Sequence, residues 1–370
     1  MQKPPFIALG GGLAGAAFAV ELARNGAPVS VLEGTRGPHH KVCGEFLSAE
    51  AQGLLAYLGL ELDALGATSV SRFRLATGGR QAQAPLPFRG AGLSRYRLDQ
   101  VLLQAAEEAG AIVERGVTVS EMKPSEGSVT LRAGSRKFTA KAVALATGKH
   151  ALRQFPRPPS DMVGFKLQLR LTADALSTLE NVVQLVMFNG GYVGALIVEN
   201  RLVSLCWVLH AALLKRIGAD WSSQAAYFAR ESERLSELLH GAEPCWDKPV
   251  AIAAIPYGYL RTEAISANIL SVGDQLAVIP SFTGDGMAIA LYSGIAAAQA
   301  ILAGEGAVSF QRRLTARLRP QFRFASVVNQ LFDRSILSGP AVRLASGLPG
   351  LVTWMVQSTR LKGFDDVIKG

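Results

Sequence analysis

Three glycines and a carboxylate near the N-terminus have the types and the spacing that bind a dinucleotide. Gly10, Gly12 and Gly15 form G-x-G-x-x-G, and Glu33 follows them. Glycines in this pattern allow a tight turn, bring bare backbone beside a pyrophosphate and let a helix pack closely on a strand. The free amides at the start of that helix direct partial positive charge at the phosphates. Glu33 is predicted to accept hydrogen bonds from both ribose hydroxyls.

The residues around this pattern predict the β-α-β unit that it requires. Residues 6–9 are a short apolar run, Gly26 ends the Ala-rich helical stretch, and residues 29–32 form the next apolar run. Residues 6–20 could instead be the apolar core of a secretory signal. However, three glycines interrupt this apolar stretch, and a predicted strand that ends in Glu33 follows it. Both observations favour the dinucleotide-binding unit.

A second glycine-rich turn lies far along the chain. Residues 268–272 are typical of a strand, which ends in Gly273 and Asp274, and P-S-F-T-G-D-G-M (280–287) leads into a predicted helix over 288–303. Its amides form another cluster of donors. Beside a flavin, Asp274 would bond the ribityl chain, and the turn would face the pyrimidine edge, where negative charge accumulates on reduction. Gly-Asp after a strand is common, so this assignment depends on the first site.

The chain resembles the FAD-dependent oxidoreductases with the para-hydroxybenzoate hydroxylase fold, and within them the geranylgeranyl reductase-like branch. Besides the two turns, K-V-C-G-E-F-L-S (41–48) and R-Y-R-L-D (95–99) carry the resemblance. The arginine of R-x-x-L-D contacts the FAD phosphates or ribose in this family, a task that suits a guanidinium fork, although Arg95 could also be a solvent-facing helix residue. The resemblance implies FAD as the cofactor, bound by Gly10, Gly12, Leu13, Ala14, Gly15, Glu33, Arg95, Gly148, Gly273, Asp274, Gly284, Gly286 and Met287.

Cys43 and Glu45 are the candidate catalytic residues, because similar reductases carry Cys-Gly-Glu at this place. Cys43 would gate the substrate or tune the flavin, or it is a small buried hydrophobe. Glu45 would transfer protons if burial raised its pKa, and a ring-orienting or capping role fits it equally. Lys166 and Arg170 alternate on the first strand of the substrate sheet, and one of them is expected to face solvent.

Asn189 and Tyr192 are candidate substrate contacts, because Asn-Gly-Gly-Tyr resembles the segment that opens the substrate cavity of geranylgeranyl reductases. The aromatic continuation Tyr-x-Trp-x-Phe-Pro of those enzymes is missing, since Val193 follows. His210 is interpreted as a structural histidine. The Trp-x-Trp-x-Ile-Pro stretch that flavin halogenases need is also missing, so we expect that class to be excluded.

A third segment departs from the resemblance. Aromatic hydroxylases of this fold usually carry Ala-Asp-Gly where this chain has A-T-G (146–148), with Thr147 at the aspartate. In those hydroxylases the segment contributes to FAD and NAD(P)H contacts, and no second β-α-β fingerprint is visible here. Electrons are therefore expected either from NAD(P)H, slowly, or from a separate reductase.

The amino-acid composition further limits the classes of protein to which this chain could belong. The 370 residues are 49% hydrophobic and 18% charged, which suits a large core, and no apolar run reaches the roughly 18 residues of a membrane span. Three separated cysteines predict neither a disulfide framework nor a metal site and indicate a cytoplasmic protein. The net charge is +9, and residues 310–370 hold ten Lys or Arg against three Asp or Glu. We expect no nucleic-acid binding, because no aromatic side chains that could stack on bases accompany this charge. The basic segment would instead contact an anionic membrane or an acidic carrier, or it would form solvent-exposed helices that cover the core.

The predicted fold is α/β, with a Rossmann-type FAD-binding domain, an inserted β-sheet substrate domain and a helical C-terminal segment. The FAD domain is discontinuous, over 1–70, 94–160 and 255–308, and the substrate sheet covers 71–93 and 161–254. Strands are expected at 165–171, 182–188, 192–198 and 202–209, and helices at 98–109 and 222–239. Residues 309–370 are expected to be helical with breaks at Pro320, Pro340 and Pro349.

The function expected is that of a monooxygenase that hydroxylates a largely hydrophobic aromatic or polyketide-like substrate through a flavin C4a-hydroperoxide. The flavin would carry the chemistry while the protein excludes water and positions the substrate. The missing geranylgeranyl-type continuation and the 280–287 loop favour this function. The alternatives are reduction of C=C bonds in a prenyl or lipid substrate, supported by Cys43 and Glu45, and electron transfer or non-catalytic binding by a flavin-bound protein.

Overall fold

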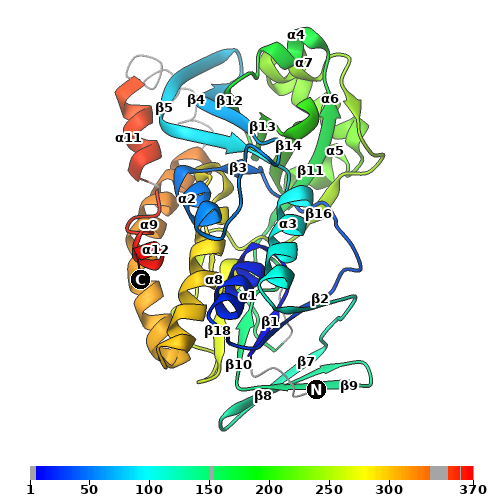
Figure 1. Ribbon diagram of the computed structural model, residues 1–370. Coiled ribbons are helices and arrows are strands. Elements are labelled where there is room, and N and C mark those ends of the chain that lie inside the picture. Colours follow the sequence, from blue (N-terminus) through cyan, green and yellow to red (C-terminus); the bar gives the residue numbers. More distant parts are fainter. Residues whose placement is uncertain (1–5, 151–153, 334–348, 359, 370) are drawn as a thin grey trace.

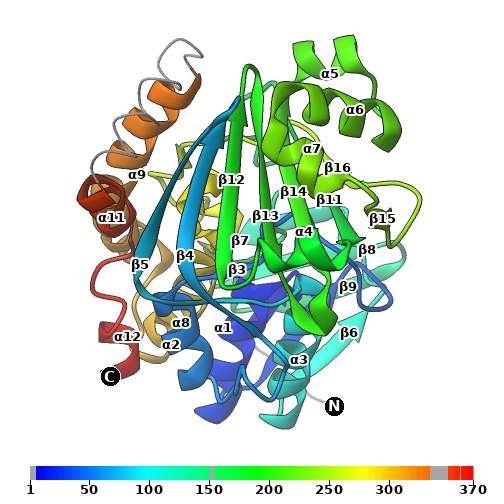
Figure 2. The ribbon, with the colours of Figure 1, turned by 90° about the horizontal axis from the view of Figure 1, so that it is seen from above.

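Two large β-sheets, one in each half of the molecule, are joined by helices that pack between and around them (Figures 1 and 2). The computed structural model describes residues 6–150, 154–333, 349–358 and 360–369.

The first sheet is parallel and has five strands in the order β18-β10-β1-β2-β6. Their bounds are β1 (Phe6–Leu9), β2 (Val29–Glu33), β6 (Ile112–Arg115), β10 (Ala142–Leu145) and β18 (Ile269–Ser271). In chain order this is the arrangement 3-2-1-4-5 of a Rossmann-type sheet. The predicted α/β fold class is confirmed.

Both faces of this sheet are covered, which explains why its strands are apolar on both sides. Ala8 and Val31 belong to a core formed with the helices α1 (Leu13–Arg24) and α8 (Gly286–Leu302). Ile7 and Leu9 belong to a separate core on the other face. That core includes residues of a small antiparallel sheet, made of β7 (Glu121–Ser125), β8 (Ser128–Ala133) and β9 (Arg136–Ala140).

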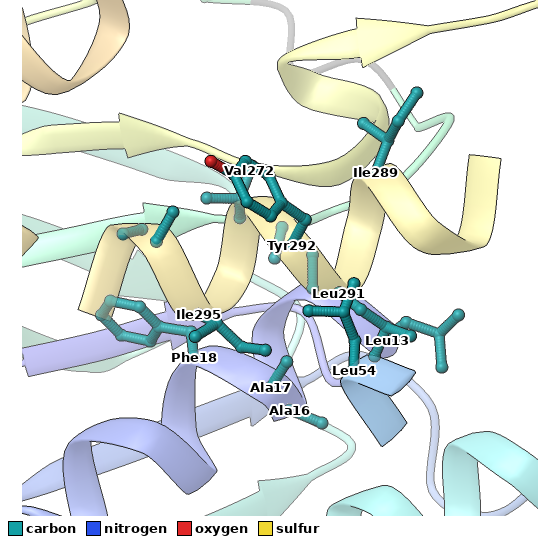
Figure 3. Close-up of a cluster of buried hydrophobic side chains, with 14 of the residues drawn as sticks. Leu13, Ala16, Ala17, Phe18, Leu54, Val272, Ile289, Leu291, Tyr292 and Ile295 are labelled. Carbon is teal, nitrogen blue, oxygen red and sulfur yellow. The ribbon is translucent and has the colours of Figure 1, made fainter. Parts of the chain in front are cut away.

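Helices α1 and α8 cross in close contact (Figure 3). A Cβ atom added at Gly294 would overlap the carbonyl oxygen of Ala14, so only glycine allows this approach. Phe18 and Ile295 fill the space beside the crossing and are fully buried. The crossing fixes the start of α1 relative to α8, and both of these helices follow a glycine-rich turn.

The second sheet is mixed, in the order β15-β11-β14-β13-β12-β4-β5-β3, with β16 paired to β11. Its strands are β3 (Phe46–Leu47), β4 (Thr68–Thr77), β5 (Arg80–Gly92), β11 (Met162–Arg170), β12 (Val182–Phe188), β13 (Gly191–Ile197), β14 (Val203–His210), β15 (Glu243–Pro244) and β16 (Val250–Ile252). β12 runs parallel to β4, and the hairpin neighbours β12, β13 and β14 are antiparallel.

The two faces of this sheet have different environments. Leu205 and Trp207 of β14 are buried in a core with the helices on the outer face, which include Phe228. These helices are α4 (Ala173–Ser177), α5 (Ala211–Ile217), α6 (Trp221–Glu231) and α7 (Glu233–Leu239). The alternate residues Cys206 and Val208 point to the opposite face, where Val208 contacts a cluster that includes Tyr257 and Phe282.

The four strands expected between residues 165 and 209 begin and end within three residues of the observed strands β11, β12, β13 and β14. The helices expected at 98–109 and 288–303 likewise begin and end within three residues of α3 (Arg95–Glu108) and α8. The helix predicted over 222–239 is two helices, because Ser232 has an extended backbone and separates α6 from α7. Helix α2 (Ala49–Tyr57), capped by the Ser48 hydroxyl, was not predicted.

The predicted break at Pro320 is wrong. Helix α9 (Ala307–Asp333) contains Pro320, which is exposed, and Leu314, Leu318 and Phe322 bury one continuous face against the main core. That packing outweighs the hydrogen bond that proline removes. Pro340 lies outside the described residues, and α11 (Pro349–Ser358) begins at Pro349.

Short elements complete the chain: β17 (Tyr259–Leu260), β19 (Ala277–Val278), α12 (Asp366–Lys369) and the 3₁₀ turns η1 (Glu199–Arg201), η2 (Gly273–Gln275) and η3 (Ser281–Thr283). Among the helices in the described part of the chain, none combines the length and the hydropathy needed to cross a bilayer.

Candidate functional site

Gly10, Gly12 and Gly15 differ in what a side chain would contact at each position. Gly10 has φ of +108°, and a Cβ atom there would overlap the carbonyl oxygen of Ala146. A Cβ atom at Gly15 would overlap the carbonyl oxygen of Gly10, so the helix starts directly against the turn. Gly12 is different, because the nearest atoms to an added Cβ are the tips of two cationic side chains, Lys41 Nζ at 3.4 Å and Arg95 NH2 at 3.6 Å.

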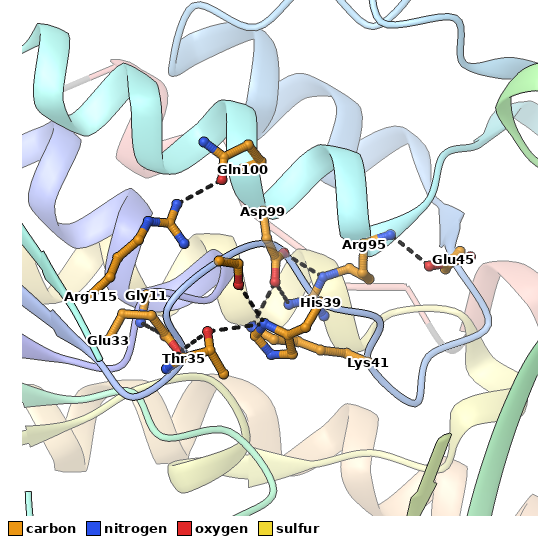
Figure 4. Close-up of polar contacts among 11 residues, drawn as sticks. Gly11, Glu33, Thr35, His39, Lys41, Glu45, Arg95, Asp99, Gln100 and Arg115 are labelled. Atoms are coloured by element: carbon orange, nitrogen blue, oxygen red, sulfur yellow. Dashed lines mark hydrogen bonds and ion pairs between the residues drawn. The ribbon is translucent and has the colours of Figure 1, made fainter. Parts of the chain in front are cut away.

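Lys41 and Arg95 are held beside Gly12 by one carboxylate (Figure 4). Arg95 donates Nε to Asp99 Oδ1 at 2.6 Å and NH2 to Oδ2 at 2.9 Å, and Lys41 Nζ lies 2.7 Å from Oδ2. Burial alone would raise the pKa of Asp99, but the two cations lower it to about 2. No side chain among the described residues caps the first turn of α1. Two cations and free amides therefore meet at Gly12, an arrangement that suits a polyanion.

Glu33 stabilises the glycine turn directly, a role that the sequence did not reveal. Its Oε2 accepts a hydrogen bond from the Gly11 amide at 2.7 Å, and Oε1 accepts from the Thr35 amide and hydroxyl at 2.9 and 2.8 Å. Burial raises the pKa of Glu33, but these amides and Lys41 lower it overall, so the carboxylate stays ionised. A pocket borders Glu33 and is lined also by Tyr96. The predicted ribose contact remains a prediction.

The second group of predicted cofactor residues meets on the other side of β10. Gly148 and Gly273 both have positive φ, at +62° and +56°. Asp274 Oδ2 lies 3.3 Å from Lys149 Nζ, and Arg157 donates to the Asp274 carbonyl oxygen at 3.1 Å. Burial lowers the pKa of Lys149, but Asp274 raises it overall. Thus residues 148 and 274, far apart in sequence, are neighbours.

The turn before α8 keeps its helix start open. Gly284 is left-handed, with φ of +72°. Asp285 is fully buried and points away from the helix start, toward Arg360 NH1 at 2.8 Å and Gln321 Nε2 at 2.6 Å. Burial raises the pKa of Asp285 to about 7. A Cβ atom at Gly286 would meet no heavy atom of the described residues within 4 Å, and no side chain there caps α8.

The predicted catalytic pair lies where the 41–45 loop meets the second sheet. Cys43 is half-buried, and its Sγ accepts a hydrogen bond from the Glu45 amide at 3.4 Å. Glu45 is fully buried with φ of +62°, a strained conformation for a non-glycine residue. Its Oε1 accepts from the Arg95 amide at 2.6 Å and pairs with Lys166 Nζ. Glu45 therefore caps the start of α3, one of the two roles predicted for it.

Sequence reasoning left Lys166 and Arg170 undecided, and the structure separates them. Lys166 is fully buried on the inner face of β11, whereas Arg170 at the strand end is exposed. The Glu45–Lys166 pair had no local signal in the sequence, because its members lie 121 residues apart. Only the pairing of β11 with its neighbours places Lys166 opposite the loop.

The predicted substrate residues do not lie together. Tyr192 is buried, with its hydroxyl 3.4 Å from that of Tyr257, which lies 2.6 Å from Ser281 Oγ. This short hydrogen-bonded chain borders an apolar cluster with Met187, Val208 and Phe282. Asn189 is exposed at the β12–β13 turn, and its carbonyl oxygen accepts from Tyr227, a residue of the outer helices. His210 Nδ1 lies 3.0 Å from Asp161 Oδ2, which fits a structural role.

No group of three or more His, Cys, Asp or Glu side chains within the described ranges is arranged to hold a metal ion.

Comparisons with known proteins identify the fold. No protein-family model and no curated protein matches the sequence. Among solved structures, the flavin-dependent brominase Bmp2 matches with a TM-score of 0.80 and 16% identity, covering 100% of this chain and 98% of that one. The halogenase PltM, in complex with phloroglucinol and FAD, matches with a TM-score of 0.76 and 17% identity, over 98% and 85%. A flavoprotein/dehydrogenase from Cytophaga hutchinsonii matches at 0.74 and 18%, over 96% and 99%. At these identities the likeness shows the fold, which is that of FAD-dependent oxidoreductases, as the sequence predicted.

Proposed function

We propose that this chain binds FAD and is a monooxygenase that acts on a largely hydrophobic aromatic acceptor. The observation that carries the proposal is the meeting of Lys41, Arg95 and the uncapped start of α1 at Gly12. Bound FAD would supply two-electron redox chemistry and the activation of oxygen.

The donor set fits FAD at each part of the molecule. Gly12, Lys41 and Arg95 would hold the pyrophosphate, and Glu33 the adenosine ribose. Asp274 would hold the ribityl chain, with Lys149 at 3.3 Å fixing its carboxylate. The open first turn of α8 at Gly286 would stabilise negative charge on the pyrimidine edge.

The inner face of the second sheet supports a hydrophobic acceptor. It carries an apolar cluster that includes Leu185, Met187, Val208 and Phe282, and the hydroxyls of Tyr192 and Tyr257 lie beside this cluster. Such a surface would keep water from a bound acceptor. The solved PltM structure contains phloroglucinol, a phenol, which supports an aromatic acceptor here as well.

Two other reactions remain as candidates. Reduction of a C=C bond is favoured by Cys43 beside Glu45. Halogenation is favoured by the likeness to PltM and Bmp2, although this chain lacks the Trp-x-Trp-x-Ile-Pro stretch.

One experiment separates these candidates. The purified flavoprotein is reduced without oxygen, oxygen is admitted, and absorbance is followed rapidly. A monooxygenase gives a transient species before reoxidation and a hydroxylated product with a phenolic acceptor. Direct reoxidation without a transient contradicts the proposal, and a halogenated product in the presence of bromide replaces hydroxylation by halogenation. NADPH alone is expected to reduce the flavin slowly, because Thr147 replaces the usual aspartate.

A further inference from the structure

A buried carboxylate stands directly before α8 but does not cap that helix. Asp285 has 0% exposure, and an aspartate at this position usually accepts hydrogen bonds from the first helical amides. Here its side chain makes no such bond, and its backbone is helical instead of extended, with φ of −102° and ψ of −3°. The first three amides of α8, those of residues 286–288, therefore have no acceptor among the described residues.

Groups from the C-terminal part of the chain hold this carboxylate away from the helix start. Arg360 NH1 lies 2.8 Å from Asp285 Oδ1, and Gln321 Nε2 donates to Oδ2 at 2.6 Å. The pKa of this carboxyl is about 7, because burial raises it more than Arg360, the Leu361 amide and Gln321 lower it. These groups belong to α9 and to the segment between α11 and α12, and both α9 and α12 pack against α8 (Figure 1).

Arg360 also holds the backbone of the turn before α8. Its NH2 group donates to the Thr283 carbonyl oxygen, so one guanidinium binds the residues on both sides of Gly284. The Arg360 side chain is itself buried, with Glu50 Oε2 3.9 Å from NH1 and the Phe88 ring centre 5.3 Å from the guanidinium carbon. A planar guanidinium suits this task, because its nitrogens meet two acceptors in a fixed geometry.

The start of α8 is the alternative position for the Asp285 carboxylate. A buried carboxylate without its cation is unfavourable, whereas free helical amides and the positive end of the helix dipole stabilise it. Gly284 and Gly286 flank Asp285 and allow the backbone rotation that this movement requires. In the structure, Arg360 and Gln321 oppose the movement.

We propose that Arg360 is a positioning residue for the flavin: it holds Asp285 away from the start of α8, so that the first three amides of this helix stay free for the pyrimidine edge. The C-terminal segment thereby tunes the reduction potential, because amides that Asp285 occupies no longer stabilise the negative charge of the reduced ring. This inference deepens the proposed function and rests on it, since it takes FAD to lie at this turn.

The experiment measures the reduction potential of the flavin-loaded full chain by dye equilibration. Wild type is compared with Arg360→Met and with two double variants, which add Asp285→Asn or Asp285→Ala to that change. Arg319→Met is the control, because it removes an exposed arginine of α9 and changes the net charge equally. Both double variants remove the two buried charges, but asparagine caps helices well and alanine does not. They therefore separate capping from the loss of charge.

Arg360→Met is expected to weaken the binding of reduced relative to oxidised flavin at least about tenfold, which lowers the potential by about 30 mV. The double variant with Asp285→Asn is expected to keep most of this fall, because its amide oxygen still occupies the helix start. The double variant with Asp285→Ala and the control Arg319→Met are expected to have the wild-type potential.

Equal potentials in the two double variants overturn the inference, because capping would then have no effect. An unchanged potential in Arg360→Met overturns it as well, and if that variant does not fold, the two double variants decide. FAD content is measured on the same preparations. A wild type that binds no FAD contradicts the proposed function, whereas a flavin-loaded wild type with equal double variants contradicts this inference alone.

Discussion

Around residues 10–15 one short stretch of backbone makes most of a binding region, whereas around Glu45 several distant segments each supply one or two side chains. In the first region, Gly10 and Gly15 are required by backbone contacts, and the two cations at Gly12 come from the 41–45 loop and from the first residue of α3, both paired with Asp99. In the second, the 41–45 loop, β11 and β14 meet only in the folded chain. The glycine-rich turn is thus a local property of the sequence, whereas the surroundings of Glu45 depend on how the two sheets are assembled.

The largest effect is expected at Gly15. Gly15→Val would force the valine side chain into the Gly10 carbonyl oxygen and separate α1 from β1. We expect the free energy of unfolding to fall by at least about 3 kcal/mol, measured by urea denaturation. Gly306→Ala is the control, because its added Cβ meets no described atom within 4 Å. A stable Gly15→Val protein would show that the turn is not as tight as described.

The next effect concerns the second region. Lys166→Met leaves Glu45 buried without its cation and is expected to lower the free energy of unfolding by about 3–5 kcal/mol, whereas adding Glu45→Gln recovers most of it. An unpaired buried carboxyl has a pKa above its unfolded value, so the loss in Lys166→Met is smallest below the unfolded pKa of about 4.3 and grows as pH rises. Urea denaturation at several pH values measures this. A loss that does not vary with pH would mean that the charge of Glu45 is not its cause.

A smaller effect on the free energy of unfolding is expected at Asp99, in the first region. The pKa of Asp99 is about 2 in the folded chain and about 3.8 in the unfolded chain, so its contribution to stability is present above pH 3.8 and is lost as pH falls toward 2. The shift corresponds to about 2 kcal/mol. Asp99→Asn is expected to flatten the fall in the free energy of unfolding between pH 5 and pH 2. The exposed Asp63→Asn is the control. Parallel curves for Asp99→Asn and wild type would contradict the role given to Asp99.

The smallest effect is expected at Glu33. Glu33→Ala removes the acceptor of the Gly11 and Thr35 amides and the proposed ribose contact, so FAD affinity is expected to fall by about 1–3 kcal/mol. Fluorescence titration with FAD measures it. Unchanged affinity would limit Glu33 to stabilising the glycine turn, with no contact to the ribose.

The same contrast explains what the sequence could predict. The β-α-β unit was predictable because glycine spacing, helix cap and strand pattern are local, and the strands β11, β12, β13 and β14 of the second sheet were predictable from their apolar runs. The short strands β3, β15 and β16 were not predicted. The sequence could not decide whether Lys166 or Arg170 faces solvent. Which face of β11 meets the 41–45 loop depends on tertiary packing, so it has no local signal. The continuity of α9 through Pro320 was missed for a related reason: its buried face outweighs local propensity.

Equilibrium binding measurements test whether FAD is held at Gly12. Wild type and Gly12→Val are titrated with FAD, with urea denaturation run in parallel. Because a Cβ atom added at Gly12 has only the ends of Lys41 and Arg95 within 4 Å among the described atoms, the variant is expected to keep the stability of the apoprotein and to lose FAD binding. Equal FAD binding by Gly12→Val and wild type, or no binding by wild type, would contradict the account.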